Sequence, residues 1–70
     1  MSEQELIERA REHVIARGWV WREPIEAKAL KWKGVDAYQI DTHVGYLGMN
    51  ASVVVAVADG AVLQSGYMPR

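Results

Sequence analysis

The chain of 70 residues contains no cysteine, which excludes disulfide bonds and thiolate-ligated metal sites. A domain of this size buries only about 60% of the surface that its unfolded chain exposes, so its stability is marginal without further support. Disulfides, a structural metal or oligomerisation usually supply that support. The two histidines lie far apart, and no cluster of metal ligands accompanies them. We therefore expect self-association, with no metal and no cofactor.

The chain also lacks an excess of basic residues and any long apolar run. Its 8 basic and 9 acidic residues give a net charge of −1, which does not favour nucleic acid or an anionic membrane as a partner. The longest apolar run, residues 53–58, is too short to span a bilayer. The first residues are acidic and polar, unlike a signal peptide. We expect one cytoplasmic domain covering residues 1–70.

The beginning of the chain predicts a helix over residues 3–17. Ser2 and Glu5 have the spacing of a capping box, in which each side chain accepts a hydrogen bond from the backbone of the other residue. Gly18 supplies the left-handed residue that ends many helices, and such an ending folds Trp19 back onto Val14. The expected apolar stripe comprises Leu6, Ile7, Ala10 and Val14.

Four strands are predicted after the helix. The first runs from residue 25 to a turn at Lys33-Gly34, and the second covers residues 35–44. A glycine-containing loop over residues 45–50 leads to the third strand, residues 51–58, and the fourth covers residues 61–68. Short connections make sequential strands pair. The predicted fold is therefore α+β, with one N-terminal helix packed on a four-stranded antiparallel meander sheet.

Asp59-Gly60 predicts the register of the last hairpin. This dipeptide is favoured in two-residue type I′ turns, which would set Val57 opposite Val62 and Ser52 opposite Tyr67. One face of the hairpin then carries Val53, Val55, Val57 and Val62, and the other carries Val54, Ala56, Leu63 and Tyr67. Both faces are apolar, whereas a half-solvated antiparallel sheet normally alternates apolar and polar residues.

A single helix covers one face of a sheet, so the other apolar face needs a partner. Contiguous exposed apolar patches usually mark interfaces. We expect a protein partner, most simply a second copy of the chain in a homodimer. The alternative is that sheet twist and the loop over residues 45–50 shelter the second face. The residues expected to bind are Trp21, Trp32, Tyr46, Leu47, Leu63 and Tyr67. If the helix instead covers the face that carries them, the residues of the opposite sheet face are expected to bind.

A second hypothesis is an enzyme or small-ligand site around Asp41 and His43. Two residues apart on a strand, they would share a face, and an aspartate that orients a histidine can assist a nucleophile such as Ser52 or Ser65. The same pair could supply two metal ligands. Without a third group in the pattern, a solvent-facing polar strand end is favoured and no catalytic residue is expected.

A third hypothesis is the binding of single-stranded nucleic acid. Lys28, Lys31 and Lys33 surround Trp32, so a base could stack on the indole while lysines meet phosphates. Strand alternation places Lys31 and Lys33 on the face opposite Lys28 and Trp32. Lysines that guard an edge strand against aggregation are the favoured interpretation.

The order of elements resembles the small cystatin-like domains, of the PepSY-like and immunity-protein type, in which a four-stranded antiparallel meander wraps one helix. The residues that carry the resemblance are the helix ending at Gly18, then Trp19-Val20-Trp21, and the closing hairpin over residues 53–66. Its Asp59-Gly60 turn is shorter than the Asp-x-x-Thr-Gly turn of PepSY-like repeats. The resemblance implies a non-catalytic, protein-binding or inhibitory role and assigns no site residue.

Overall fold

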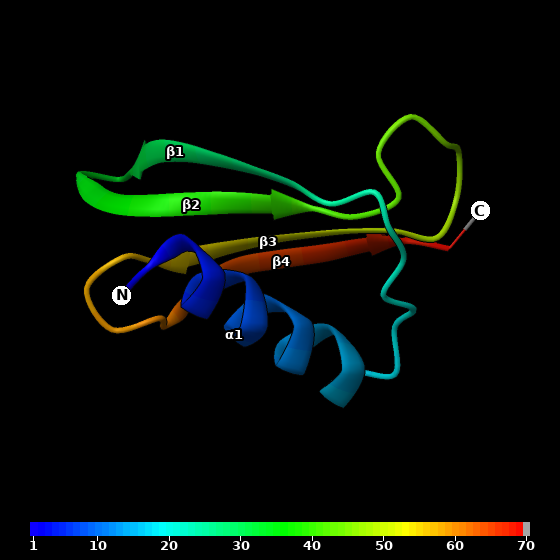
Figure 1. Cartoon of the computed structure of the whole chain (residues 1–70), viewed down its shortest axis with the longest axis horizontal. Helices are drawn as coiled ribbons and strands as arrows, with labels where there is room; N and C mark the ends of the chain where they lie inside the picture. Colours follow the sequence, from blue (N-terminus) through cyan, green and yellow to red (C-terminus); the bar gives the residue numbers. More distant parts are fainter. Residues whose placement is uncertain (70) are drawn as a thin grey trace.

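The chain folds as one helix packed against a four-stranded antiparallel sheet, in a computed structural model that describes residues 1–69 (Figure 1). The elements are α1 (Glu3–Ala16), β1 (Glu26–Trp32), β2 (Val35–Asp41), β3 (Asn50–Ala56) and β4 (Val62–Met68). The sheet order β1-β2-β3-β4 is a meander. The predicted α+β fold is confirmed.

The helix begins and ends with the predicted signals. The Glu5 N–H donates to Ser2 Oγ at 3.2 Å, and the Ser2 N–H donates to Glu5 Oε1 at 2.8 Å, which completes the capping box. At the other end Gly18 has a φ of 78°, and the Trp19 N–H donates to the Val14 carbonyl at 3.0 Å. This is a Schellman ending, and it directs the following chain back toward the sheet.

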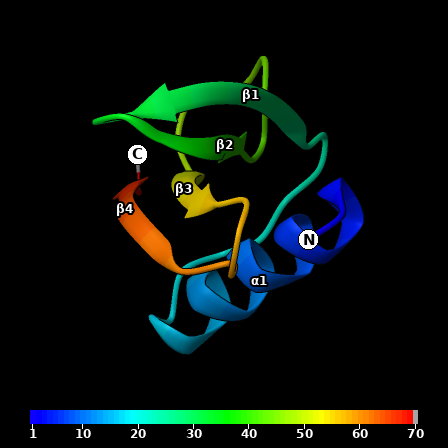
Figure 2. The same cartoon turned by 90° about the vertical axis from the view of Figure 1, so that its left-hand side faces the viewer.

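The core lies between α1 and one face of the sheet. Leu6, Ala10 and Val14 are fully buried on the helix, as the periodicity predicts. They pack against side chains of the two central strands, namely Ile40, Ala51, Val53 and Val55. Figure 2 shows the strands as a curved layer with α1 on one side only. We call the face toward α1 the helix face and the opposite face the open face.

The hairpin between β3 and β4 differs from the predicted register by one residue up to Val54, and by two at a bulge beyond it, where Val62 pairs with Val55 rather than with Val57. Ser52 pairs with Gly66 rather than with Tyr67, and Tyr67 pairs with Ala51. A type I′ turn needs positive φ at both central residues, whereas of Asp59 and Gly60 only Gly60 adopts it, at 73°. The Asp59 carboxylate instead accepts the Ala61 N–H at 3.0 Å within a longer loop.

The second strand ends earlier than predicted. β2 stops at Asp41 because His43 adopts a positive φ of 53° and leaves the strand conformation. The N–H groups of His43 and Val44 then donate to the carbonyls of Arg22 and Pro24, at 2.8 and 3.1 Å. These bonds tie the start of the β2–β3 loop to the segment between α1 and β1.

Candidate protein-binding surfaces

The hairpin end of the open face carries an apolar patch. Leu30 of β1 lies opposite Ala37 of β2, which in turn lies opposite Ala56 of β3, and Trp32 lies opposite Val35. Ala37 and Ala56 are buried, Leu30 and Trp32 are half-buried, and Val35 is exposed. Small alanines therefore form the floor of the patch, and the larger side chains stand around it. We call these five residues the open-face patch.

The two rows of the open face next to the patch are largely polar, contrary to the sequence prediction. One cross-strand row contains Lys28, Gln39, Val54 and Gln64, and the next contains Glu26, Asp41, Ser52 and Gly66. The one-residue shift in the last hairpin is the cause, since it moves Tyr67 to the helix face. Val54 is only 4% exposed although α1 does not cover it. The curved sheet thus shelters part of this face itself.

A hollow of about 460 Å³ lies at the other end of the sheet, beside the β2–β3 loop. Val44, Tyr67 and Met68 supply apolar lining, and Glu26 and Asp41 supply two carboxylates from opposite positions on β1 and β2. The Gln39 amide donates to both Asp41 oxygens, at 3.2 and 3.3 Å. No lysine or arginine among residues 1–69 forms a salt bridge with either carboxylate.

The β2–β3 loop is held in shape by Asn50. Its side-chain amide nitrogen lies 3.2, 2.9 and 3.1 Å from the carbonyl oxygens of Thr42, His43 and Tyr46. The His43 ring stacks on Tyr46 with centroids 4.6 Å apart, and its Nδ1 lies 2.9 Å from the Gly48 carbonyl oxygen. Leu47 stands at the tip with 98% of its surface exposed.

The six predicted binding residues occupy four different places. Trp32 belongs to the open-face patch, and Tyr46 and Leu47 are exposed on the β2–β3 loop. Leu63 is half-buried on β4. Trp21 and Tyr67 pack against the core on the helix side, so their predicted place on the uncovered face is wrong. For Tyr67 the reason is the hairpin register, and for Trp21 it is the return of the chain along the helix side.

Asp41 and His43 do not share a strand face, contrary to expectation. Asp41 ends β2 and lines the hollow, whereas His43 lies beyond the strand and contacts Tyr46 and Gly48. Ser52 lines the hollow on the side of Asp41, away from the His43 ring. Ser65 contacts His13 instead, with Oγ 2.9 Å from Nε2. Among residues 1–69 no three histidine, aspartate or glutamate side chains cluster as metal ligands.

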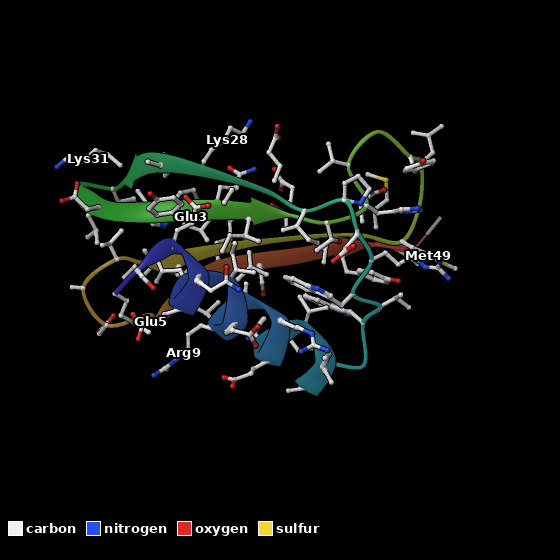
Figure 3. The ribbon with its side chains drawn as sticks, viewed as in Figure 1. Glu3, Glu5, Arg9, Lys28, Lys31 and Met49 are labelled. Atoms are coloured by element: carbon white, nitrogen blue, oxygen red, sulfur yellow. The ribbon has the colours of Figure 1, made fainter. Side chains whose placement is uncertain are left out.

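The lysines around Trp32 point in different directions. Lys28 and Lys31 both project into solvent from β1 (Figure 3), and Lys31 Nζ forms an ion pair with Asp36 at 2.8 Å. Lys33 lies in the turn with its Nζ 5.9 Å from the centre of the Trp32 ring. The stretch therefore presents no single row of cations beside an aromatic face, which a single strand of nucleic acid would need.

The sequence indicates only a loop ending at Asn50 and does not predict the role of its side chain. The three acceptors gather around the Asn50 amide only after the chain has folded. The glycines at 45 and 48 have φ values of 91° and 84°, and they were the available signal that this loop follows a defined path.

Comparison with protein-family models, curated proteins and solved structures finds no match. No helix among residues 1–69 has the length and hydropathy of a membrane-spanning segment.

Proposed function

We propose that the chain is a non-catalytic protein-binding domain that meets its partner through the open-face patch and works as a homodimer. The observation that carries this proposal is the position of Trp32 on the sheet face that α1 leaves uncovered. Tryptophan is enriched among the residues that dominate binding energy at protein interfaces.

The geometry of the patch supports a protein rather than a small molecule as the ligand. Leu30, Trp32 and Val35 form a shallow apolar surface over an alanine floor, with Lys28 in the next row. An apolar centre with a polar rim is the usual anatomy of a protein interface. The cystatin-like resemblance implies the same class of role. The absence of cysteine favours a cytoplasmic setting.

The small size of the chain supports self-association. With 70 residues and no cysteine, the domain has a small core and no covalent support. A second copy would bury further apolar surface at about 25 cal/mol per Å². Sedimentation equilibrium from micromolar to millimolar concentration tests this part, and a monomer throughout would contradict it.

Selection from a random peptide library tests the binding surface. Selected peptides should bind the wild-type chain, and Trp32→Ser should weaken them by about tenfold or more, as loss of an interface anchor does. Leu47→Ser is the matched control, since Leu47 is the most exposed apolar residue of the rival surface. Peptides that lose affinity with Leu47→Ser and keep it with Trp32→Ser would move the binding site to the β2–β3 loop and overturn the proposal.

A further inference from the structure

β4 is an outer strand without the usual protection of sheet edges. Its residues Val62–Met68 include no charged residue and no proline. β4 is last in the sheet order, and no ribbon lies beyond its outer side in Figure 2. Natural edge strands carry charges, prolines or bulges because an open edge pairs readily with another chain. The bulge of β4 lies at its beginning, beside Val55, and the rest of the strand is regular.

The opposite edge of the sheet is protected. β1 carries Glu26, Lys28 and Lys31 along the same length of strand. Two copies of β1 paired antiparallel about Ala29 would set Glu26 against Trp32 and the lysines against apolar residues. Charge therefore disfavours β1 and leaves β4 as the edge open to pairing.

The side chains of β4 are arranged symmetrically about Ser65. Two large apolar residues precede the centre, Val62 and Leu63, and two follow it, Tyr67 and Met68. Antiparallel pairing about a two-fold axis at Ser65 sets Leu63 of one copy against Tyr67 of the other. The bulge places Val62 opposite Val55 on the helix face, whereas Met68 lies opposite Asn50 on the open face, so the regular part of this pairing covers residues 63–67. Apolar and aromatic cross-strand pairs of this kind stabilise antiparallel sheets, and no like charges oppose each other.

We propose that two copies of the chain pair through β4, antiparallel about Ser65, and join their four-stranded sheets into one of eight strands. This inference rests on the proposed homodimer and names its interface. The open-face patches lie at the hairpin end of each sheet and stay free for another protein. The dimer would therefore present two copies of the binding surface.

A charge exchange at Gln64 and Gly66, which the Ser65 axis sets opposite each other on the open face, tests the register. Both positions are exposed, and a Cβ on Gly66 would meet no atom within 4 Å. The double variant Q64K/G66E sets the introduced lysine against the introduced glutamate of the other copy, and it should dimerise at least as tightly as the wild type. The double variant Q64K/G66K sets like charges together and should raise the dimer Kd by about tenfold.

Val35→Lys is the matched control, because Val35 is an exposed valine on the open face. It should leave the Kd unchanged, and sedimentation equilibrium measures all variants after circular dichroism has shown that they fold. If the wild type is a dimer that Val35→Lys dissociates and the β4 variants do not, the dimer forms through the open face. The β4 interface is then wrong and the homodimer stands. If the wild type is a monomer at millimolar concentration, both the β4 interface and the homodimer are wrong.

Discussion

The ring of Trp19 stacks on the ring of Tyr67, with centroids 5.4 Å apart and planes inclined by 8°. Trp19 follows the last turn of α1, and Tyr67 lies near the end of β4. The stack therefore joins the Schellman ending of the helix to the edge strand. Arg17 adds a cation 5.1 Å from the centre of the Trp19 ring, which extends the stacked group.

This stack should contribute measurably to stability. Trp19→Ala and Tyr67→Ala each remove one ring, and a double-mutant cycle in urea should give a coupling free energy of about 0.5–1.5 kcal/mol. Tyr67→Phe keeps the ring and should preserve the coupling. Additive effects of the two alanine substitutions would show that the rings do not stabilise each other.

Asn50 should determine the order of the β2–β3 loop. Asn50→Asp replaces the donating amide with a carboxylate of the same size, which repels the carbonyls of Thr42, His43 and Tyr46. We expect a loss of about 1–3 kcal/mol in the free energy of unfolding. Amide exchange over residues 42–49 should accelerate more than exchange in β3. Leu47→Ala, in the same loop, should change neither, and equal behaviour of the two variants would contradict the role of Asn50.

The capping box should make the stability of the folded chain depend on pH. The backbone N–H of Ser2, which donates to the Glu5 carboxylate, and the Ser2 side chain lower the pKa of Glu5 below its ordinary value. A carboxyl whose folded-state pKa is depressed contributes stability above its unfolded pKa and loses it as pH falls through the folded value. The wild type should therefore lose an advantage over Glu5→Gln as the pH falls below 4.5, the ordinary pKa of a glutamate.

Thermal unfolding of the two proteins across this pH range measures the effect. Glu3→Gln is the matched control, because Glu3 also lies in the first turn of α1 and is not part of the capping box. A wild-type advantage that is constant with pH would contradict the assignment to Glu5.

Gly34 and Gly66 should respond to alanine in opposite ways. Gly34 has a φ of 86° in the β1–β2 turn, where a Cβ is strained, so Gly34→Ala should destabilise the chain by about 1–2 kcal/mol. Gly66 lacks a positive φ, and a Cβ there would meet no atom within 4 Å. Gly66→Ala should be neutral or stabilise by up to about 1 kcal/mol, because it restricts the unfolded chain. Urea titration of both variants checks the difference.

Local signals in the sequence predicted the elements and their order. Ser2 with Glu5, and Gly18 with Trp19, bounded the helix because each signal involves residues within one or two turns. The turn at Lys33-Gly34 was also predicted, and there both residues have positive φ, at 49° and 86°. These features depend on the backbone preferences of neighbouring residues, which a single sequence contains.

The register of the last hairpin could not be predicted in the same way. Asp59-Gly60 fits a two-residue turn as well as a longer loop, and the choice depends on tertiary contacts. The Gly60 N–H donates to the Ala56 carbonyl and the Ala56 N–H to the Ala61 carbonyl, both at 2.8 Å, so the connection forms a loop over residues 57–61. The one-residue shift in register places Tyr67 and its neighbours on β4 on the sheet faces opposite to those predicted. The composition of the open face depends on this register.

The β2–β3 loop, which the Asn50 side chain holds in shape, offers a site for labelling the protein. Leu47 takes almost no part in holding the fold, while the backbone on either side of it is secured by the Asn50 amide and the His43 ring. Position 47 is therefore the natural point at which to attach a fluorophore or an affinity tag to this cysteine-free chain. A single cysteine introduced there would carry the label at a well-ordered position, at the opposite end of the sheet from the tryptophan-bearing hairpin.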